Sequence, residues 1–219
     1  MFTGIVRELG TVAAVRRAGG IIRLAIHAPR TAPRLAIGES VAINGVCVSV
    51  VGNQRGMLTF EAIQETQRLT NLGRLAVGDR VNVEPSLTLS DRLNGHLVLG
   101  HIDGLGRIRR RVQQAGEVAV EIQVSRDLCR SLVPKAPIAL DGVSLTVGSR
   151  LTSTTFTVFL IPETMRKTTL GVCRAGDAVN IELDYVAKLI AQFARPKQYQ
   201  LTQLLKGVTK RNRHAEFDW

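Results

Sequence analysis

The chain has 219 residues, 45% apolar and 21% charged, and its 29 Lys and Arg against 18 Asp and Glu give a formal net charge of +11. This composition is ordinary for a folded protein, and the length suits two domains of roughly 90 to 100 residues. No stretch approaches the roughly 18 consecutive apolar residues that a membrane span needs. The first residues carry no basic segment leading into an apolar run, so we expect a cytoplasmic protein with no membrane partner.

Two features of the composition argue against common kinds of site. Cys47, Cys129 and Cys173 are far apart, which fits reduced thiols and predicts neither a disulfide framework nor a metal site. Basic residues cluster at 107–111 and 206–213, but aromatic residues, which would stack on bases, are only 4% of the chain. We interpret the charge as solvated basic surface and expect no nucleic-acid partner, with a nucleic-acid-binding barrel as the alternative.

Short segments rich in Val, Ile, Thr and Phe predict β-strands along the chain. They tend to alternate apolar and polar residues and cover residues 21–27, 40–51, 57–62, 118–124, 138–147 and 156–161. The dipeptides Asn44-Gly45 and Asp141-Gly142 are strong turn signals, since these residue types tolerate positive φ. Many short strands with little helix between them indicate a small closed barrel or sandwich.

The spacing of apolar residues changes from that of a strand to that of a helix near the end of the chain. Asp184 is a candidate N-cap, and apolar residues then recur at helical spacing until Pro196 interrupts them. The stripe consists of Val186, Leu189, Ile190, Phe193, Leu201, Leu204, Leu205 and Val208. A helix with one apolar face and no further domain to cover favours oligomerisation.

The chain contains an internal repeat. Residues 65–73 match residues 163–171 at six of nine positions, an offset of 98. Residues 78–84 match residues 176–182 at the same offset, and the two turn dipeptides align at an offset of 97. The offset between the two copies changes by a single residue, which is typical of loops that absorb insertions between fixed strands. The sequence therefore predicts two copies of one β-rich domain.

The two copies differ at a few polar positions. Cys47 aligns with Ser144, Ser49 with Thr146, and Ile5 with His101. Residues two apart share one face of a strand, so each copy presents a pair of hydrogen-bonding side chains on one side. Such small residues are also common in the interior of a strand, but recurrence in both copies favours ligand pockets. His101, among glycines, is a candidate for proton transfer, although a lone histidine is more often structural.

Together these motifs resemble the riboflavin synthases of the alpha-chain type. The matching segments are residues 1–6, 44–47, 65–73, 95–104, 141–147 and 161–171, in the family's order. The resemblance implies an all-β fold of two tandem six-stranded Greek-key barrels with pseudo-twofold symmetry and a C-terminal helix that assembles a homotrimer. The implied domains are residues 1–95, 96–187 and 188–219.

The resemblance also implies an activity. Family members convert two molecules of 6,7-dimethyl-8-ribityllumazine into riboflavin and 5-amino-6-ribitylaminouracil, the final step of riboflavin biosynthesis, without a metal or separate cofactor. Each barrel binds one lumazine, and the N-terminal barrel of one chain meets the C-terminal barrel of its neighbour. Association with lumazine synthase is a further family property. The alternative is a non-catalytic lumazine or flavin binder of the same fold.

The resemblance assigns roles to residues of both repeats. His101, Ser144 and Thr146 are expected beside one lumazine, where the C7 methyl group loses a proton. Cys47 and Ser49 are expected in the opposing pocket, with Phe2 and residues 4–6 as its wall. The implied binding set is Phe2, Gly4, Ile5, Val6, Cys47, Val48, Ser49, Glu61, Ala62, Ile63, Gln64, Glu65, Thr66, Gly100, His101, Ile102, Lys135, Ser144, Leu145, Thr146, Ile161, Pro162, Glu163, Thr164, Met165, Arg166 and Asp184.

Overall fold

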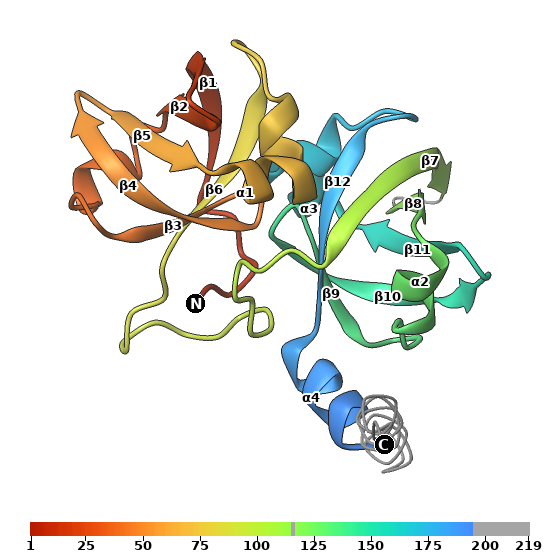
Figure 1. Ribbon diagram of the computed structural model, residues 1–219. Helices are drawn as coiled ribbons and strands as arrows, with labels where there is room; N and C mark the ends of the chain where they lie inside the picture. Colours follow the sequence, from red (N-terminus) through yellow and green to blue (C-terminus); the bar gives the residue numbers. More distant parts are fainter. Residues whose placement is uncertain (115–116, 195–219) are drawn as a thin grey trace, which may run out of the picture. The chain divides into compact units, whose positions relative to one another are not determined.

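The computed structural model describes residues 1–114 and 117–194 (Figure 1). Its first half forms a closed antiparallel barrel with the strand order β1-β2-β5-β4-β3-β6. The strands are β1 (Glu8–Ala18), β2 (Ile21–His27), β3 (Ser40–Ile43), β4 (Val46–Gln54), β5 (Met57–Ala62) and β6 (Arg80–Pro85). In this order β3, β4 and β5 form consecutive hairpins and β6 returns beside β3, which is the Greek-key pattern.

The second half repeats this architecture. Its barrel has the order β10-β11-β8-β7-β12-β9. Because both barrels are closed, the order can be followed from any strand in either direction, and each strand of the second barrel then has the same two neighbours as its equivalent in the first. The strands are β7 (Gly104–Gln114), β8 (Glu117–Gln123), β9 (Pro137–Leu140), β10 (Val143–Leu151), β11 (Thr155–Leu160) and β12 (Ala178–Leu183). The predicted pair of six-stranded Greek-key barrels is confirmed. The predicted domain limits stay predictions.

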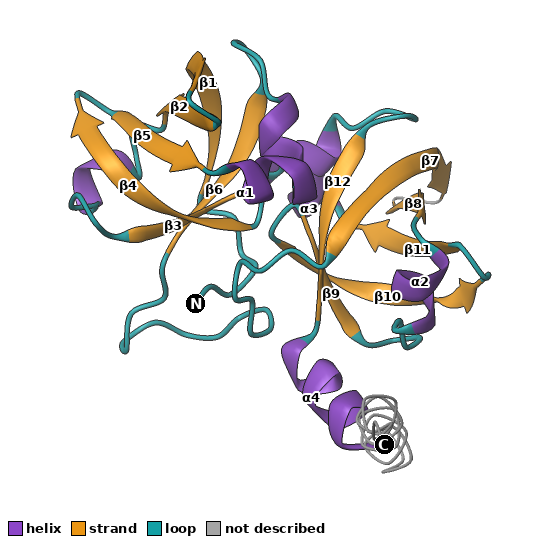
Figure 2. Cartoon of the chain, viewed as in Figure 1, coloured by secondary structure: helices purple, strands orange, loops and turns teal. Residues whose placement is uncertain are grey.

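Every predicted strand segment contains observed strand, and both turn dipeptides separate two strands. The prediction did not define β1, β6, β7 or β12. In β1, burial is confined to the first half of the strand, and the second half is exposed and basic, so the sequence lacks a regular apolar alternation. The helices are short (Figure 2): η1 (Ala32–Arg34), α1 (Gln64–Leu69), η2 (Asn71–Arg74), α2 (Arg126–Arg130), α3 (Pro162–Lys167) and η3 (Thr169–Gly171).

Each barrel has its own apolar core. Alternate residues of the strands point inward, as in β2, where Ile22, Leu24 and Ile26 are buried between exposed or half-buried neighbours. Phe60 fills the first core and Phe156 the second. Because one face of every strand is committed to a core, the opposite face of the same strand is available for a site.

Reciprocal hydrogen bonds between equivalent residues connect the two barrels. Asn180 donates from Nδ2 to the carbonyl of Asn44 at 2.8 Å, and Asn82 donates from Nδ2 to the carbonyl of Asp141 at 2.9 Å. Asn71 donates from Nδ2 to Oδ1 of Asp141 at 2.9 Å. Burial raises the pKa of the Asp141 carboxyl to about 7, against the lowering effect of hydrogen bonds from Asn180 and Asn71. This network fixes the relation between the two barrels.

The turn dipeptides also meet. A Cβ on Gly45 would lie 2.5 Å from the backbone nitrogen of Gly142, and the φ angles of the two glycines are +76° and +74°. The close approach and the left-handed backbone both require glycine here.

The described helix of the C-terminal unit is α4 (Tyr185–Ala194). It matches the predicted helix after Asp184, and Val186, Leu189, Ile190 and Phe193 of the apolar stripe are exposed in this chain. Pro196, Leu201, Leu204, Leu205 and Val208 lie outside the described residues. Within the described ranges, no helix has the length and apolarity needed to cross a membrane.

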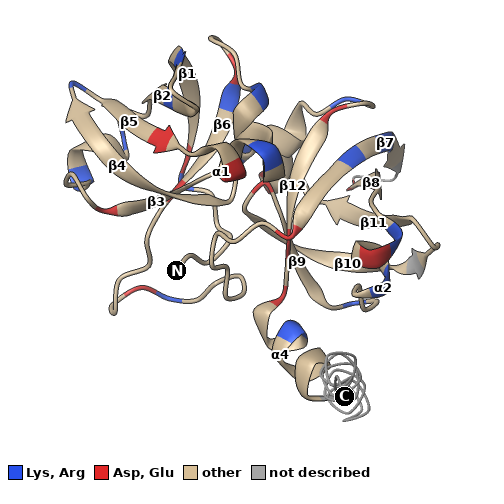
Figure 3. Ribbon diagram, in the orientation of Figure 1, with Lys and Arg blue, Asp and Glu red and all other residues tan. Residues whose placement is uncertain are grey.

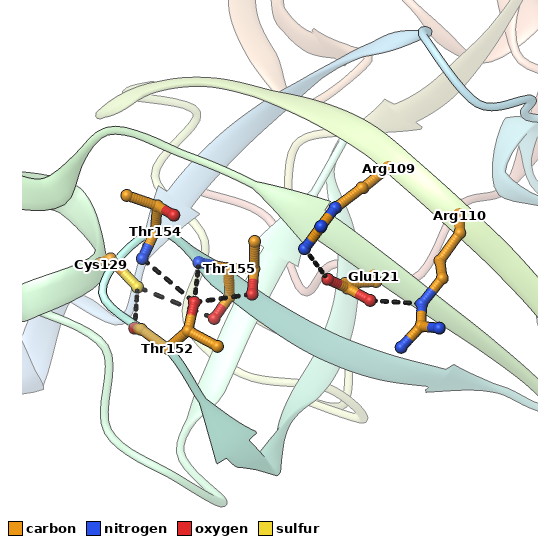
Figure 4. A network of polar contacts seen from close by, with 7 residues as sticks. All are labelled: Arg109, Arg110, Glu121, Cys129, Thr152, Thr154 and Thr155. Atoms are coloured by element: carbon orange, nitrogen blue, oxygen red, sulfur yellow. Dashed lines mark hydrogen bonds and ion pairs between the residues drawn. The ribbon is translucent and has the colours of Figure 1, made fainter.

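Lys and Arg are spread over strands and loops of both barrels (Figure 3). The basic run at 107–111 lies on β7, where Arg109 and Arg110 pair with Glu121 at 2.8 and 2.5 Å (Figure 4). Arg107 and Arg111 donate to the carbonyls of Gly176 and Gly171. These guanidinium groups therefore bind groups of their own chain. The run at 206–213 lies outside the described residues.

Candidate active site

The candidate site begins on the outer face of β4 and β10. Cys47 and Ser49 alternate with buried Val46, Val48 and Val50, so both polar side chains point away from the core. At the equivalent place on β10, Ser144 is half-buried and Thr146 is exposed. The predicted pairing of these side chains on one face holds in both barrels. We call the outer face around Cys47 and Ser49 the N-terminal site, and the one around Ser144 and Thr146 the C-terminal site.

The ends of β5 and β11 border these faces. Val50 pairs with Phe60, so one step further along the ladder Ser49 is opposite Glu61. Val147 pairs with Val158, which places Thr146 opposite Phe159 in the same way. Ile63 and Ile161, just beyond these strands, are 61% and 60% exposed. Each site thus combines hydroxyl or thiol groups with an exposed apolar side chain, as a flat heterocycle with polar edges requires.

Two glycines bring chain segments from the other half onto these faces. The carbonyl of Gly4 accepts from the N–H of Ser144 at 2.8 Å, and the carbonyl of Gly100 accepts from the N–H of Cys47 at 3.0 Å. Their φ angles are +74° and +83°, and a Cβ on either would lie within 2.6 Å of the Cβ of Ser144 or Cys47. Only glycine fits at these two positions.

Two buried carboxylates hold these glycines from the opposite side. Glu84 accepts from the N–H of Gly4 at 3.1 Å, and Glu182 accepts from the N–H of Gly100 at 2.9 Å. Burial raises the pKa of Glu84, while hydrogen bonds from Thr3 and Gly4 lower it. Each glycine therefore has its N–H bound by one barrel and its carbonyl bound by the other.

This arrangement differs from the expected grouping of the site residues. Within one chain, residues 4–6 adjoin Ser144 in the C-terminal site, and Gly100, which precedes His101, adjoins Cys47 in the N-terminal site. The sequence grouping placed His101 with Ser144 and residues 4–6 with Cys47. The reason is that the segment before each barrel forms hydrogen bonds to the other barrel. An alignment of the two repeats compares equivalent residues and does not show which barrel a segment contacts.

A histidine outside the predicted set lies at the C-terminal site. His96 is buried, and its Nδ1 is 2.7 Å from Oγ of Ser144. Its Nε2 is buried with no hydrogen-bond partner among the described residues. Burial lowers the pKa of His96, and the charge of Asp184 raises it. The imidazole is therefore neutral at neutral pH and is held against a hydroxyl group of the site.

His96 is not among the residues predicted for the site, and at the repeat offset of 96 it has no counterpart in the first copy. The available signal was the neighbouring glycine. A Cβ on Gly95 would lie 2.1 Å from the carbonyl oxygen of Thr3 and 2.9 Å from the Cβ of Ser144. This glycine lets the backbone approach Ser144 closely enough for His96 to reach its hydroxyl.

Other predicted residues have their side chains in the interior. Val48 and Ala62 are 7% and 3% exposed and belong to the first core. Phe2 is fully buried and packs with Val98 between the barrels. These positions can offer a ligand only their backbone. Partly buried residues that pack on a core are Val6, Ile102, Leu145 and Met165.

The short helices α1 and α3 follow β5 and β11 directly. Glu65 pairs with Arg68 at 3.0 Å, and Glu163 pairs with Lys167 at 2.6 Å, so both carboxylates are engaged within their own helix. The other predicted residues of these helices are exposed or half-buried: Gln64, Thr66, Pro162, Thr164 and Arg166.

Lys135 has a φ of +68°, which is unusual for a residue with a side chain. The equivalent residue of the first repeat, at an offset of 97, is Gly38, with a φ of +93°. Like Arg55, at a φ of +49°, Lys135 carries a long cationic side chain in a backbone conformation that favours glycine. Its backbone N–H donates to the carbonyl of Val147, next to Thr146 in the C-terminal site.

The structure also has a cavity of about 710 Å³ that is lined by Arg7, Arg34, Ser40 and Glu84 among others. It contains none of the predicted site residues. In the described part of the chain, no group of three or more His, Cys, Asp or Glu side chains is arranged to hold a metal ion.

The fold and the paired sites define a class of protein. The lumazine binding domain family matches this chain twice, over residues 3–86 and 99–184, and the chain belongs to this family. Within it, the chain belongs to the riboflavin synthases. It is 34% identical to the riboflavin synthase of Bacillus subtilis over 96% of both chains, and 39% identical to that of Mycobacterium bovis over 89% of this chain and 98% of the relative.

Solved structures share the fold. LumP complexed with riboflavin superposes with a TM-score of 0.78 at 23% identity, covering 84% of this chain and 99% of LumP. LumP complexed with 6,7-dimethyl-8-(1'-D-ribityl) lumazine superposes with a TM-score of 0.76 at 22% identity, with the same coverage.

Proposed function

We propose that this chain is a riboflavin synthase, which transfers a four-carbon unit between two molecules of 6,7-dimethyl-8-ribityllumazine to form riboflavin and 5-amino-6-ribitylaminouracil. The observation that carries the proposal is the duplicated site: two outer faces of matching design, each with a hydroxyl or thiol pair and an exposed isoleucine. A reaction between two identical molecules needs two such faces. Its relatives over nearly the whole length are named for this activity.

The C-terminal site supplies the proton acceptor in this proposal. The C7 methyl group of the bound lumazine is acidic, and its deprotonation yields the carbon nucleophile. Neutral His96, 2.7 Å from the hydroxyl of Ser144, can take up a proton through that hydroxyl. Thr146 lies on the same face of β10 as Ser144, and the negative charge of Asp184 raises the pKa of His96. Lys135 completes the polar groups of this site.

The N-terminal site holds the acceptor molecule. Cys47 lies beside Gly100, and its thiol or a water molecule adds across a C=N bond of the ring that receives the four-carbon unit, with a proton passing to the ring nitrogen. The added group is eliminated again before riboflavin is released. His101, the residue after Gly100, is exposed and is the proton donor or acceptor on this side. Ser49 and Thr66 border the same ligand.

Both sites are open faces in a single chain. We propose that they are closed in a homotrimer, in which the N-terminal site of one chain faces the C-terminal site of its neighbour. The exposed stripe of α4, with Phe193 85% exposed, supports an assembly role for the tail. Alignment of two flat rings at such an interface supplies an effective-molarity advantage of up to roughly 7 to 11 kcal/mol. A cytoplasmic location and association with lumazine synthase belong to the same proposal.

A turnover assay tests the function. Purified protein is incubated with 6,7-dimethyl-8-ribityllumazine, and riboflavin is followed by its absorbance. We expect one riboflavin for every two lumazines consumed. Stoichiometric binding without turnover would instead support the second candidate, a non-catalytic lumazine or flavin binder. The fold of LumP, seen in complexes with both ligands, is the observation behind that candidate.

A further inference from the structure

The cavity of about 710 Å³ lies at one end of the first barrel. Its wall comes from the segment before β1, the segment between β2 and β3, the end of β6 and the loop that follows β6. These strand ends are neighbours because β6 pairs with both β1 and β3. The volume is within the range of about 300 to 1,000 Å³ that is typical of small-molecule sites.

Three arginines line this cavity. Arg30 is held by its own chain: Nη2 donates to the carbonyl of Arg7 at 3.1 Å, and Nε lies 3.7 Å from Oε1 of Glu8. Within residues 1–114 and 117–194, the guanidinium groups of Arg7 and Arg34 take part in no hydrogen bond or ion pair. Each carries five N–H donors in a planar fork that matches the oxygen atoms of a phosphate group.

Three carboxylates also line the cavity, and each already accepts hydrogen bonds from its own chain. Glu39 accepts one backbone N–H at 2.9 Å, and Glu84 accepts two, at 2.7 and 3.1 Å. Asp91 accepts from the N–H and the hydroxyl of Thr88 at 2.9 and 2.7 Å. Because the carboxylates balance the arginines in number, the wall offers an anion directed donors and not a general positive field.

Part of the wall is apolar. Leu35, Pro85 and Leu87 line the same cavity, and Leu35 packs on the first core. The N–H of Leu87 donates to the carbonyl of Met1 at 2.9 Å, which ties the loop after β6 to the start of the chain. The cavity therefore combines guanidinium donors with a fixed apolar surface, which suits an anion that carries an organic group.

We propose that this cavity binds the phosphate monoester of a small, partly apolar molecule, with Arg7 and Arg34 as donors to the phosphate oxygens. Leu35 and Leu87 contact the organic group. The proposal goes beyond the proposed function, because it adds a ligand of a different chemical class. The cavity adjoins the N-terminal site at β3, where Ser40 of the cavity wall pairs with Ser49, but the two ligands occupy separate places.

Calorimetric titration of the full-length protein tests the ligand class. The probes are phenyl phosphate, inorganic phosphate and phenol. We expect phenyl phosphate to bind at least about tenfold more tightly than inorganic phosphate, and phenol to give no measurable heat. A tenfold gain corresponds to about 1.4 kcal/mol, which the burial of about 55 Å² of apolar surface provides. Equal affinities for the two phosphates would show that the organic group is not recognised, and would overturn the proposal.

A competition experiment tests whether the cavity is a separate site. Phenyl phosphate is titrated into protein that is saturated with 6,7-dimethyl-8-ribityllumazine. We expect the stoichiometry of phenyl phosphate binding to be unchanged. Displacement of lumazine by phenyl phosphate would instead place the probe in a lumazine site, and would contradict the proposal.

Substitutions test the named donors. Arg7→Ala and Arg34→Ala should each weaken phenyl phosphate binding at least about tenfold, since each removes charged hydrogen bonds. Arg34→Lys, which keeps the charge and loses the planar fork, should recover part of the affinity. Neither guanidinium group binds a described residue of its own chain, so both alanine variants should fold as the wild type does. Wild-type affinity in both alanine variants would rule out this site.

Arg130→Ala is the matched control. Arg130 is the equivalent of Arg34 in the second barrel, at the offset of 96, and lines a different cavity of only about 160 Å³. Its removal changes the net charge by the same amount and should leave the affinity for phenyl phosphate unchanged. A loss in Arg130→Ala equal to that in Arg34→Ala would mean that overall charge, and not this cavity, attracts the probe.

Discussion

The backbone N–H of Cys47 donates to the carbonyl of Gly100 at 3.0 Å, and the N–H of Gly100 donates to Glu182 of the second barrel at 2.9 Å. Gly4 repeats this pattern with the barrels exchanged, between Ser144 and Glu84. The segment that leads into each barrel thus helps to build the site of the other. A change at either glycine should affect both the site and the junction of the barrels.

Gly4→Ala and Gly100→Ala should therefore destabilise the protein. The left-handed backbone alone disfavours a side chain by about 1 to 2 kcal/mol, and the new Cβ would also overlap Ser144 or Cys47. We expect the free energy of unfolding in urea to fall by more than this amount in each variant. Gly38→Ala, with a φ of +93° and no heavy atom within 4 Å, isolates the backbone contribution. Equal losses in all three variants would contradict the close approach.

Ser144→Ala and His96→Ala should lower kcat far more than they lower lumazine affinity. Proton transfer by a positioned side chain typically contributes a factor of about 10² to 10⁴. Because burial holds the pKa of His96 below its ordinary value of 6.5, the rate should be constant near neutral pH and fall on acidification only below 6.5. Steady-state kinetics from pH 5 to 8 measure this fall in rate. His27→Ala, an exposed histidine of β2, should leave the profile unchanged.

His101→Ala should also lower turnover more than ligand affinity, if His101 moves a proton in the N-terminal site. Single-turnover kinetics measure the loss of rate, and lumazine titration of the same preparation measures the loss of affinity. An equal loss of rate and affinity would show that His101 only binds the ligand.

Asp141→Asn should remove a pH dependence of stability. The folded pKa of about 7 exceeds the ordinary value of 3.8, so the folded state binds the extra proton. The contribution of Asp141 to stability is then fully present below pH 3.8 and is lost as the pH rises from 3.8 to about 7, by at most about 4 kcal/mol. In Asp141→Asn this decline should disappear. Asn44 occupies the equivalent position in the first barrel, so the fold accommodates the amide. The measurement is urea unfolding from pH 4 to 8.

Lys135→Gly should separate stability from activity. Relief of the positive φ should raise the free energy of unfolding by up to about 1 kcal/mol, while loss of the ammonium group lowers kcat/KM. Arg55→Gly, at a φ of +49° in the turn between β4 and β5, is the control. It should give a similar gain in stability with unchanged activity. A fully active Lys135→Gly enzyme would remove Lys135 from the site.

The sequence by itself determined the duplication, the strand-rich architecture and the polar pairs on β4 and β10. These features are local. Strand alternation places Cys47 and Ser49 on one face whatever the rest of the fold does, and a repeat is visible as matching residues. The turn dipeptides likewise follow from the conformational preferences of Asn, Asp and Gly.

Only the tertiary structure decided which segments complete which site. Residues 4–6 and 100–102 are far in sequence from the faces they join, and their hydrogen bonds to Ser144 and Cys47 depend on how the chain crosses between barrels. The same holds for His96, whose partner Ser144 is 48 residues away. Such contacts arise from long-range packing: a glycine such as Gly95 can mark a close approach in the sequence, but it does not say which distant residue is approached.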